Sequence, residues 1–438
     1  MMQNNAMLLQ SLKKNIEDYC DANFDFRFNP AEPAVHLQEP TFGSEEIFAA
    51  LETLLSTYTT MGKKVKAFEA QYAEYVNGQY GVMTNSGSSN NLLAVAALSN
   101  PVTQDHLKPG DEVIVPALSW STTVWPVIQC GLVPVFVDCD LNDFNLDLEK
   151  LEKAIGPKTR AIKLVHVYGN PCNMDGILAL AKKHNLFVIE DCCEAMGALY
   201  DGRHVGTFGL VGTYSFFFAH QITTLEGGIA VTNDFNFSET MRILRAHGWS
   251  REAVEHQKYV NMYPDIDPRF IFINLGYNLR PTELNAAMGQ IQLPKLDGFN
   301  DQRRQAAHYL IKNLSQYADY FHFQQETPKA KHVWFGFPIV IKENAPFTVK
   351  EITAYLQAHH IDTRPIIAGN MARHPALKMY PHRISGDLEA ADTIMRRGFT
   401  FACHHAVDRQ ACDYILETIH AFMANCLNKS NLLQGKAV

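Results

Sequence analysis

Between residues 81 and 191 the chain alternates short apolar segments with stretches of helical pattern, and this alternation constrains the fold more than any other sequence feature. Apolar runs bounded by turn residues predict buried strands, and the stretches 90–98 and 177–184 between them have helical character. Strands that alternate with helices predict a mostly parallel sheet covered by helices on both faces. The expected strands are 81–84, 112–116, 133–138, 161–166 and 186–191.

Helical patterns precede this region, and after residue 296 the regular alternation of strands and helices ends. Apolar residues at helical spacing predict helices over 7–19 and 44–55. We therefore expect an N-terminal helical segment at 1–41, a large α/β domain at 42–296 and a smaller α+β domain at 297–438. The elements expected in the last part are a helix at 301–317, strands around 333–341, and helices at 348–359, 390–397 and 411–428.

The charge of the chain limits its partners without naming one. A formal net charge of -8 over 438 residues argues against nucleic acid or an anionic membrane as the main partner, although a local basic pocket for a nucleotide diphosphate is compatible with it. The longest apolar runs, such as 214–219, are too short to cross a bilayer. We expect no membrane partner.

The cysteines give no sign of a metal or disulfide framework. None of the nine forms a Cys-x-x-Cys pair or a Cys/His spacing suited to zinc, so we expect no metal site. The first residues lack a secretory signal pattern, which predicts a cytoplasmic protein with reduced and mostly buried thiols.

Polar and aromatic residues follow several of the predicted strands, at the edge of the sheet where ligands of such folds bind. The cluster Thr-Asn-Ser-Gly-Ser-Ser-Asn-Asn at 84–91 stands between a strand and a helix, so its backbone amides could meet a phosphate, although such clusters are more often simple turns. Trp120 follows the next strand and offers an indole for stacking, whereas we expect Trp125 in the core. Asp191 ends another strand, a position that a helix cap also favours.

A further segment, 213–232, reads Thr-Tyr-Ser-Phe-Phe-Phe-Ala-His-Gln-Ile-Thr-Thr-Leu-Glu-Gly-Gly-Ile-Ala-Val-Thr. It resembles the motif Ser-Phe-x-x-x-Lys-x-x-Thr-x-x-Glu-Gly-Gly of the sugar-nucleotide branch of fold-type I pyridoxal-phosphate (PLP) enzymes, the DegT/DnrJ/EryC1/StrS aminotransferase family. His220 stands where these enzymes carry the lysine that forms a Schiff base with the cofactor. Matches in the same order extend from about residue 42 to about residue 370.

The resemblance implies a role for each matched position. It implies a mostly parallel, seven-stranded type of sheet sandwiched by helices, a PLP site at its edge and a homodimer in which Asn278 reaches the neighbouring subunit's phosphate. His247, Arg280 and Arg364 would bind substrate or glutamate, the arginines through their planar forks. Cofactor residues implied in the same way are Gly87, Ser88, Ser89 and Ser215 at the phosphate, Trp120 on the ring, Asp191 at the pyridine nitrogen, and Glu194 in place of a more common glutamine.

The histidine at 220 selects among the activities of the family. An imidazole forms no stable imine with an aldehyde, so the cofactor would be held without a covalent tether and His220 would move protons as the catalytic residue. This combination, with the segments 116–123 and 245–251, resembles the branch of the family that removes the C3 hydroxyl from GDP-4-keto-6-deoxymannose. The resemblance implies that glutamate is the amino donor, which gives pyridoxamine phosphate. It also implies a place in deoxysugar and O-antigen biosynthesis.

A second histidine-bearing branch of the family uses an iron-sulfur cluster, which requires four cysteine ligands. Apart from Cys193, cysteines are missing from the expected region, because 247–263 contains none. We therefore expect no cluster.

Two alternatives to the dehydratase stay open from the sequence. The chain could be a transaminase of the same fold that keeps the nitrogen in its product, or a cofactor-binding but catalytically silent regulator in which His220 is only a satisfied buried histidine. The choice between a GDP- and a CDP-linked sugar also stays open.

Overall fold

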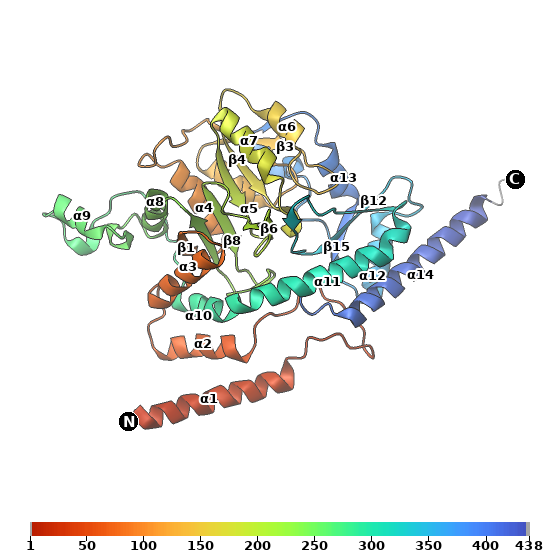
Figure 1. Cartoon of the computed structure of the whole chain (residues 1–438), viewed down its shortest axis with the longest axis horizontal. Coiled ribbons are helices and arrows are strands. Elements are labelled where there is room, and N and C mark those ends of the chain that lie inside the picture. Colours follow the sequence, from red (N-terminus) through yellow and green to blue (C-terminus); the bar gives the residue numbers. More distant parts are fainter. Residues whose placement is uncertain (1, 435–438) are drawn as a thin grey trace.

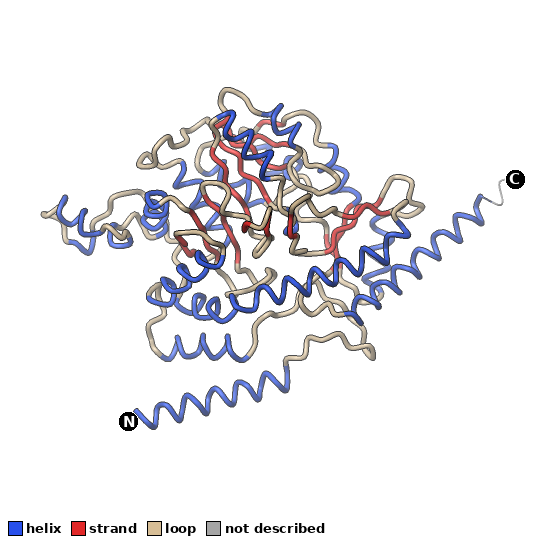
Figure 2. Tube along the Cα trace, in the orientation of Figure 1, coloured by secondary structure: helices blue, strands red, loops and turns tan. Residues whose placement is uncertain are grey.

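The computed structural model describes residues 2–434, with the side chains of 5–428. Its centre is an eight-stranded sheet, visible as the red strands in the middle of Figure 2. Every neighbouring pair is parallel except those of β9 (Gly228–Thr232), which runs antiparallel to both neighbours. The sheet order is β1 (Tyr80–Thr84), β9, β8 (Val211–Ser215), β5 (Phe187–Asp191), β4 (Thr159–Val165), β2 (Glu112–Pro116), β3 (Val133–Val137) and β14 (Arg383–Ile384).

Helices cover both faces of this sheet because successive side chains of each buried strand point to opposite sides. In β2, Val113 and Val115 belong to one apolar cluster and Ile114 to the other. The expectation of a mostly parallel sheet sandwiched by helices is thus confirmed. The first cluster is completed by α4 (Gly87–Leu98), α5 (Ser121–Gln129) and α8 (Phe235–Arg245), the second by α3 (Lys63–Tyr75), α6 (Leu148–Ala154) and α7 (Met174–His184).

A second, antiparallel sheet lies in the C-terminal part of the chain and forms a third apolar cluster. Its order is β10 (Phe321–Phe323), β12 (Phe337–Ile341), β15 (Gly398–Phe401) and β13 (Thr363–Arg364). The helices that pack on it are α11 (Leu296–Leu314), α12 (Val349–Ala358) and α14 (Arg409–Gln434).

The C-terminal part also contributes to the large sheet, which the sequence patterns did not suggest. The two-residue strand β14 pairs in parallel with β3, and Ile366 and Ile394 lie in the same apolar cluster as Val113. The domain boundary at 296–297 therefore stays a prediction, although α11 begins at Leu296.

The remaining helices include α1 and α2 at the amino-terminal end and α9 further along the chain (Figure 1). In that view α1 (Met2–Asn23) runs along the lower edge beside α2 (Ser44–Leu55), and α9 (His256–Met262) projects at the left. The other elements are α10 (Glu283–Gln292), α13 (Glu389–Arg397), the small sheet β11 (Ala330–Lys331), β6 (Leu199–Tyr200) and β7 (Arg203–His204), and the 3₁₀ turns η1 (Val167–Gly169), η2 (Ser250–Glu252), η3 (Pro268–Phe270), η4 (Leu293–Lys295), η5 (Ser315–Tyr317), η6 (Met371–Arg373) and η7 (Pro375–Met379).

The expected helices at 7–19 and 44–55 are present as α1 and α2, and those expected near 301–317, 348–359, 390–397 and 411–428 as α11 to α14. Across the described residues, no helix is both long and apolar enough to traverse a bilayer. All nine cysteines lie in the described range, and six of them are buried.

Candidate functional site

The candidate site lies where the carboxyl ends of β1, β8, β5 and β2 meet. Thr84 at the end of β1 and Ser215 at the end of β8 both pair with Gly228 of β9, so the two strand ends lie side by side. Asp191 ends β5 beside Thr213 of β8. The register of the sheet thus brings together residues that are more than a hundred positions apart in sequence.

The start of α4 packs directly against Ser215. A Cβ atom on Gly87 would lie 2.4 Å from the Ser215 Cβ, so only glycine permits this approach. Ser86 caps the helix, because its hydroxyl accepts a hydrogen bond from the Ser89 N–H at 3.1 Å. Gly87 and Ser88 carry the first N–H groups of the helix, and an anion at this point would meet them and the Ser215 hydroxyl together.

The carboxylate of Asp191 is held in a buried polar network. Its Oδ2 accepts hydrogen bonds from Asn91 Nδ2 at 2.9 Å and Thr123 Oγ1 at 2.7 Å, while Oδ1 accepts one from the Cys193 N–H at 3.2 Å. Burial would raise the pKa of Asp191, but the Lys163 ammonium, 3.6 Å from Oδ2, and these hydrogen bonds hold it below its ordinary value. The group is therefore an ionised carboxylate with room for a further donor at Oδ1.

His220 lies in a turn directly after β8, where its N–H donates to the Phe217 carbonyl at 2.9 Å. Its ring is 5.1 Å from the Phe335 ring and 6.3 Å from that of Phe217, centroid to centroid. Nδ1 has no hydrogen-bond partner among the described residues. Burial, reinforced by the positive charge of Arg364, lowers the pKa of His220 to about 3. At neutral pH the side chain is thus an uncharged imidazole with one nitrogen free to take a proton.

Arg364 and Glu194 flank the same space. The Arg364 guanidinium lies 5.5 Å from the Phe335 ring centroid, and its Nε has no partner among the described residues. Glu194 Oε2 accepts a hydrogen bond from the Tyr168 N–H at 2.8 Å. Burial raises the pKa of Glu194 to about 7, against the opposing effects of that hydrogen bond and of Arg364. Arg364 therefore acts as a fixed cation on both His220 and Glu194, and the Glu194 carboxyl group titrates near neutral pH.

The two tryptophans differ as expected. Trp120 is the residue before α5 and is 55% exposed, so its indole is available to a ligand. Trp125 packs against the core cluster of the large sheet.

The remaining predicted residues form an outer group around Trp249. The His247 ring meets the Trp249 ring edge-on with centroids 5.3 Å apart, and the Arg280 guanidinium lies 6.0 Å from that ring. Arg280 Nε donates to Asn278 Oδ1 at 3.0 Å, while Asn278 itself is exposed. His247 and Arg280 therefore both contact Trp249, and Asn278 is joined to Arg280 by a side-chain hydrogen bond.

One backbone contact connects the outer group to the start of α4. The Asn85 N–H donates to the Leu279 carbonyl at 2.9 Å, between Asn278 and Arg280. The segment that carries Asn278 and Arg280 is thus tied through Leu279 to the turn that precedes Gly87.

Sequence patterns missed five residues that shape this site. Asn91 and Thr123 bind Asp191, Phe335 lies against His220, and the buried Arg303 holds the Phe335 carbonyl at 3.2 Å. Only Lys163 left a signal, as a lysine within an apolar strand pattern. The others come from segments whose meeting depends on tertiary packing.

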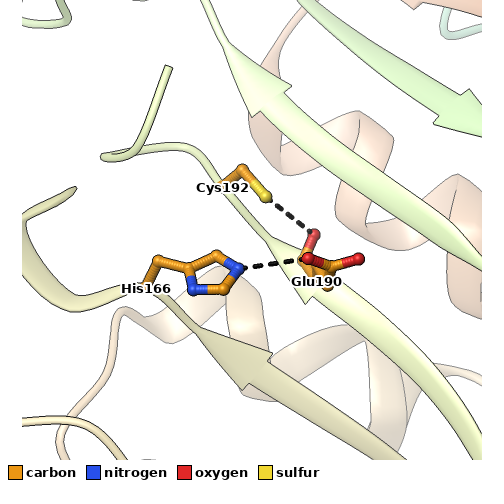
Figure 3. Close-up of side chains that lie close together, drawn as sticks. All are labelled: His166, Glu190 and Cys192. Carbon is orange, nitrogen blue, oxygen red and sulfur yellow. Dashed lines mark hydrogen bonds and ion pairs between the residues drawn. The ribbon is translucent and has the colours of Figure 1, made fainter. Parts of the chain in front are cut away.

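A different cluster, His166, Glu190 and Cys192, is close enough to hold a metal and lies under the sheet edge (Figure 3). His166 Nδ1 accepts from the Cys172 N–H, so Nε2 carries the proton that it donates to Glu190 at 3.3 Å. The Glu190 carboxylate also accepts three backbone N–H groups of the 206–209 segment. Because its lone pairs are used and the imidazole is already oriented, the cluster is explained as a structural hydrogen-bond network.

The arrangement defines a member of the DegT/DnrJ/EryC1/StrS aminotransferase family: the family pattern matches residues 40–420, and the chain belongs to this family. The GDP-4-keto-6-deoxy-D-mannose 3-dehydratase of Yersinia pseudotuberculosis is 40% identical over 376 residues, which cover 85% of this chain and 94% of that protein. A solved structure of the Escherichia coli GDP-4-keto-6-deoxy-D-mannose-3-dehydratase with bound hydrated PLP matches with a TM-score of 0.83 at 37% identity, covering 88% of this chain and 98% of that one.

The neutrality of His220 can be tested directly in the cofactor-free protein. Since its folded pKa of about 3 lies below the ordinary histidine value, we expect the imidazole to stay uncharged as the pH falls from 7.5 to 5. Nuclear magnetic resonance of imidazole-labelled protein measures this, with the spectrum of His220→Asn identifying the resonance. A His220 signal that titrates with a midpoint above pH 6 would contradict the buried geometry.

Proposed function

We propose that this protein is a PLP- and pyridoxamine-phosphate-dependent 3-dehydratase that acts on GDP-4-keto-6-deoxymannose, with glutamate as amino donor. The observation that carries the proposal is His220, a neutral base at the family's lysine position in a site that keeps Asp191, Ser215 and the α4 turn. The two dehydratases named above support the choice of substrate. Because its proposed substrates are cytoplasmic metabolites, we propose the cytoplasm as its place of action.

The residues present fit the cofactor. Gly87, whose place only glycine can take beside Ser215, lets the first amides of α4 meet a phosphate. Asp191 Oδ1 has a lone pair left for a pyridinium N–H. Nδ1 of His220 has no partner among the described residues and is therefore left to bond a ligand.

Each side chain then has a task. Ser88 and Ser89 with Gly87 and Ser215 bind the phosphate, and Trp120 stacks on the ring. Asp191 keeps the ring nitrogen protonated. When bound, the cofactor carries the amino group from glutamate and accepts the electrons of a departing proton. Glu194, oriented by the Tyr168 N–H and close to the charge of Arg364, would contact the bound cofactor.

His220 moves the protons of both half-reactions at the cofactor's C4' atom. Its imidazole takes the proton from glutamate's α-carbon and delivers it to C4'; with the sugar bound it takes a proton from C4' as the C3 hydroxyl leaves. The overall change balances: glutamate and the 4-keto sugar give 2-oxoglutarate, ammonia and the 3-deoxy sugar, so glutamate is oxidised and C3 is reduced. No iron or external reductant is required by this balance.

The arginines bind the anionic parts of the substrates. Among the cations, Arg364 has the largest effect on the pKa of His220, and its Nε has no partner among the described residues. We therefore assign it to the carboxylate of glutamate or to the sugar nucleotide. His247 and Arg280, in the outer group, are assigned to the more distant portion of the sugar nucleotide.

The deciding experiment incubates the protein with PLP, glutamate and GDP-4-keto-6-deoxymannose, and then measures product mass and free ammonia. A dehydratase gives a 3-deoxy sugar and one ammonia per turnover, a transaminase keeps the nitrogen in the sugar, and a silent protein makes no 2-oxoglutarate. The CDP-linked sugar serves as the comparison substrate, and anaerobic iron chelation is expected to leave the rate unchanged.

We further propose a homodimer in which Asn278 and Arg280 complete the partner's site, because this segment resembles the family segment that reaches a dimer-related site and Asn278 is exposed. Mixing inactive His220→Asn with inactive Arg280→Ala is then expected to restore about a quarter of the wild-type activity, since half of the randomly mixed dimers carry one intact site. Each variant subjected alone to the same unfolding and refolding is the control. Mixed dimers without recovered activity would place Arg280 in the site of its own chain.

A further inference from the structure

A lysine lies beneath the carboxylate that we assign to the cofactor ring. Lys163, on β4, is fully buried, and its Nζ lies 2.7 Å from Asn91 Oδ1 and 3.6 Å from Asp191 Oδ2. Asn91 in turn donates to that same Asp191 oxygen. Lysine is rarely buried unless it is paired, so this residue requires an electrostatic reason for its position.

The other titratable groups around Lys163 carry no compensating charge. Burial raises the pKa of the Cys192 and Cys193 thiols well above the ordinary value, so both are neutral near pH 7. Burial also lowers the pKa of Lys163 itself, and Asp191 is the main group that opposes this. The ammonium and the Asp191 carboxylate are thus each other's counter-ion.

We infer that Lys163 is a positioning residue that serves as the resident counter-ion of Asp191, keeping that carboxylate ionised and oriented whenever the cofactor is absent and limiting how strongly it binds the protonated ring. The inference rests on the proposed function. A family member with a lysine tether keeps its cofactor, whereas His220 leaves this site to pass through cofactor-free states. In such states a buried carboxylate without a counter-ion would destabilise the folded protein.

The charge balance gives the sign of the effect. With Lys163 present, the charges of Lys163 and Asp191 sum to zero before the ring binds. The protonated ring nitrogen then adds one positive charge to this pair. Without it, the site is negative before binding and neutral afterwards, because the pyridinium becomes the only counter-ion of Asp191. Removal of the lysine charge therefore destabilises the cofactor-free protein but strengthens its binding of a protonated ring.

The test compares Lys163→Met and Lys163→Gln with Lys150→Met. Lys150 pairs with another buried aspartate, Asp138, at 2.8 Å, and lies outside the site. Titration of the folded, cofactor-free proteins with pyridoxamine phosphate at about pH 8 is expected to give a Kd about tenfold lower for both Lys163 variants than for the wild type. The pKa of the bound ring nitrogen, followed by absorbance, is expected to rise by about one unit.

Lys150→Met is expected to lower the thermal midpoint of the cofactor-free protein while leaving the Kd and the ring titration unchanged. An unchanged or weaker Kd in both Lys163 variants, with the wild type binding normally, would overturn the inference and leave the proposed function standing. If the wild type bound neither PLP nor pyridoxamine phosphate, the inference on Lys163 and the proposed function would both be wrong.

Should the Lys163 variants not fold alone, they are refolded with saturating pyridoxamine phosphate and, separately, with inorganic phosphate. Recovery with the first and not the second supports the counter-ion role, because only the first supplies a ring cation at Asp191. Failure under both conditions would overturn it.

Discussion

His220→Asn is expected to bind the cofactor and yet lose both half-reactions, with a fall in dehydration rate of about 10³-fold or more. An amide has nearly the shape of the imidazole edge but cannot take up a proton, and the turn after β8 is fixed by backbone contacts that the substitution leaves in place. Cofactor affinity and the rate of 2-oxoglutarate formation are measured on the same preparation. A variant that still dehydrated the sugar at the wild-type rate would show that another group moves the proton.

His220→Lys is expected to gain a covalent bond to the cofactor, which the wild-type protein lacks. The wild-type protein treated with PLP and borohydride is expected to carry no pyridoxyl group on any lysine of the site, whereas the variant is expected to acquire a stoichiometric adduct at residue 220. Peptide mass spectrometry locates it. Most of the dehydration should be lost, because the ε-amine competes with water for the cofactor's carbon. A stoichiometric lysine adduct in the wild type would refute the untethered site.

Arg303→Met is expected to destabilise the fold by about 3 kcal/mol, since it leaves buried carbonyl groups without a donor. Arg303 is fully buried on α11 and its Nη1 binds the carbonyls of Trp334, Phe335 and Cys403, the last at 2.6 Å. Because the Phe335 ring lies against His220 and the Arg303 charge also lowers the pKa of His220, the substitution should return that pKa toward its ordinary value.

The neighbouring substitution Arg304→Met is the control. Arg304 also binds a backbone carbonyl, that of His332, but is partly exposed and pairs with Glu326. Denaturant unfolding of both variants measures the loss of stability, and imidazole titration follows His220. Equal losses in the two variants, with an unmoved His220 titration, would show that Arg303 does not anchor the site.

The sequence predicted the parts of this site that depend on strand ends. Asp191, Ser215 and Gly87 each follow directly from a buried strand or begin the next helix, and parallel pairing then places them at one edge. Local pattern carries this information because side-chain periodicity and turn residues are properties of short segments.

The remaining features depend on how distant segments pack, which no local pattern contains. Phe335 meets His220 where its backbone is bound by Arg303 of α11 and by the Tyr168 carbonyl. The two-residue strand β14 is too short to give a periodic signal. Lys163 interrupts an apolar strand visibly, but its meaning depends on Asp191, which belongs to the neighbouring strand.

The strand β14 also sets a mechanical limit on the protein. Arg383 pairs with Val135 of β3, and its guanidinium grips both oxygens of Glu112, at 3.0 and 2.6 Å. These two contacts connect the C-terminal part of the chain to the large sheet. Arg364 belongs to β13 of the smaller sheet. A wide hinge rotation between the two sheets would break this strand pairing and this ion pair. Arg364 and His220 therefore keep a fixed relative position, and substrates enter the site through movements of side chains and loops.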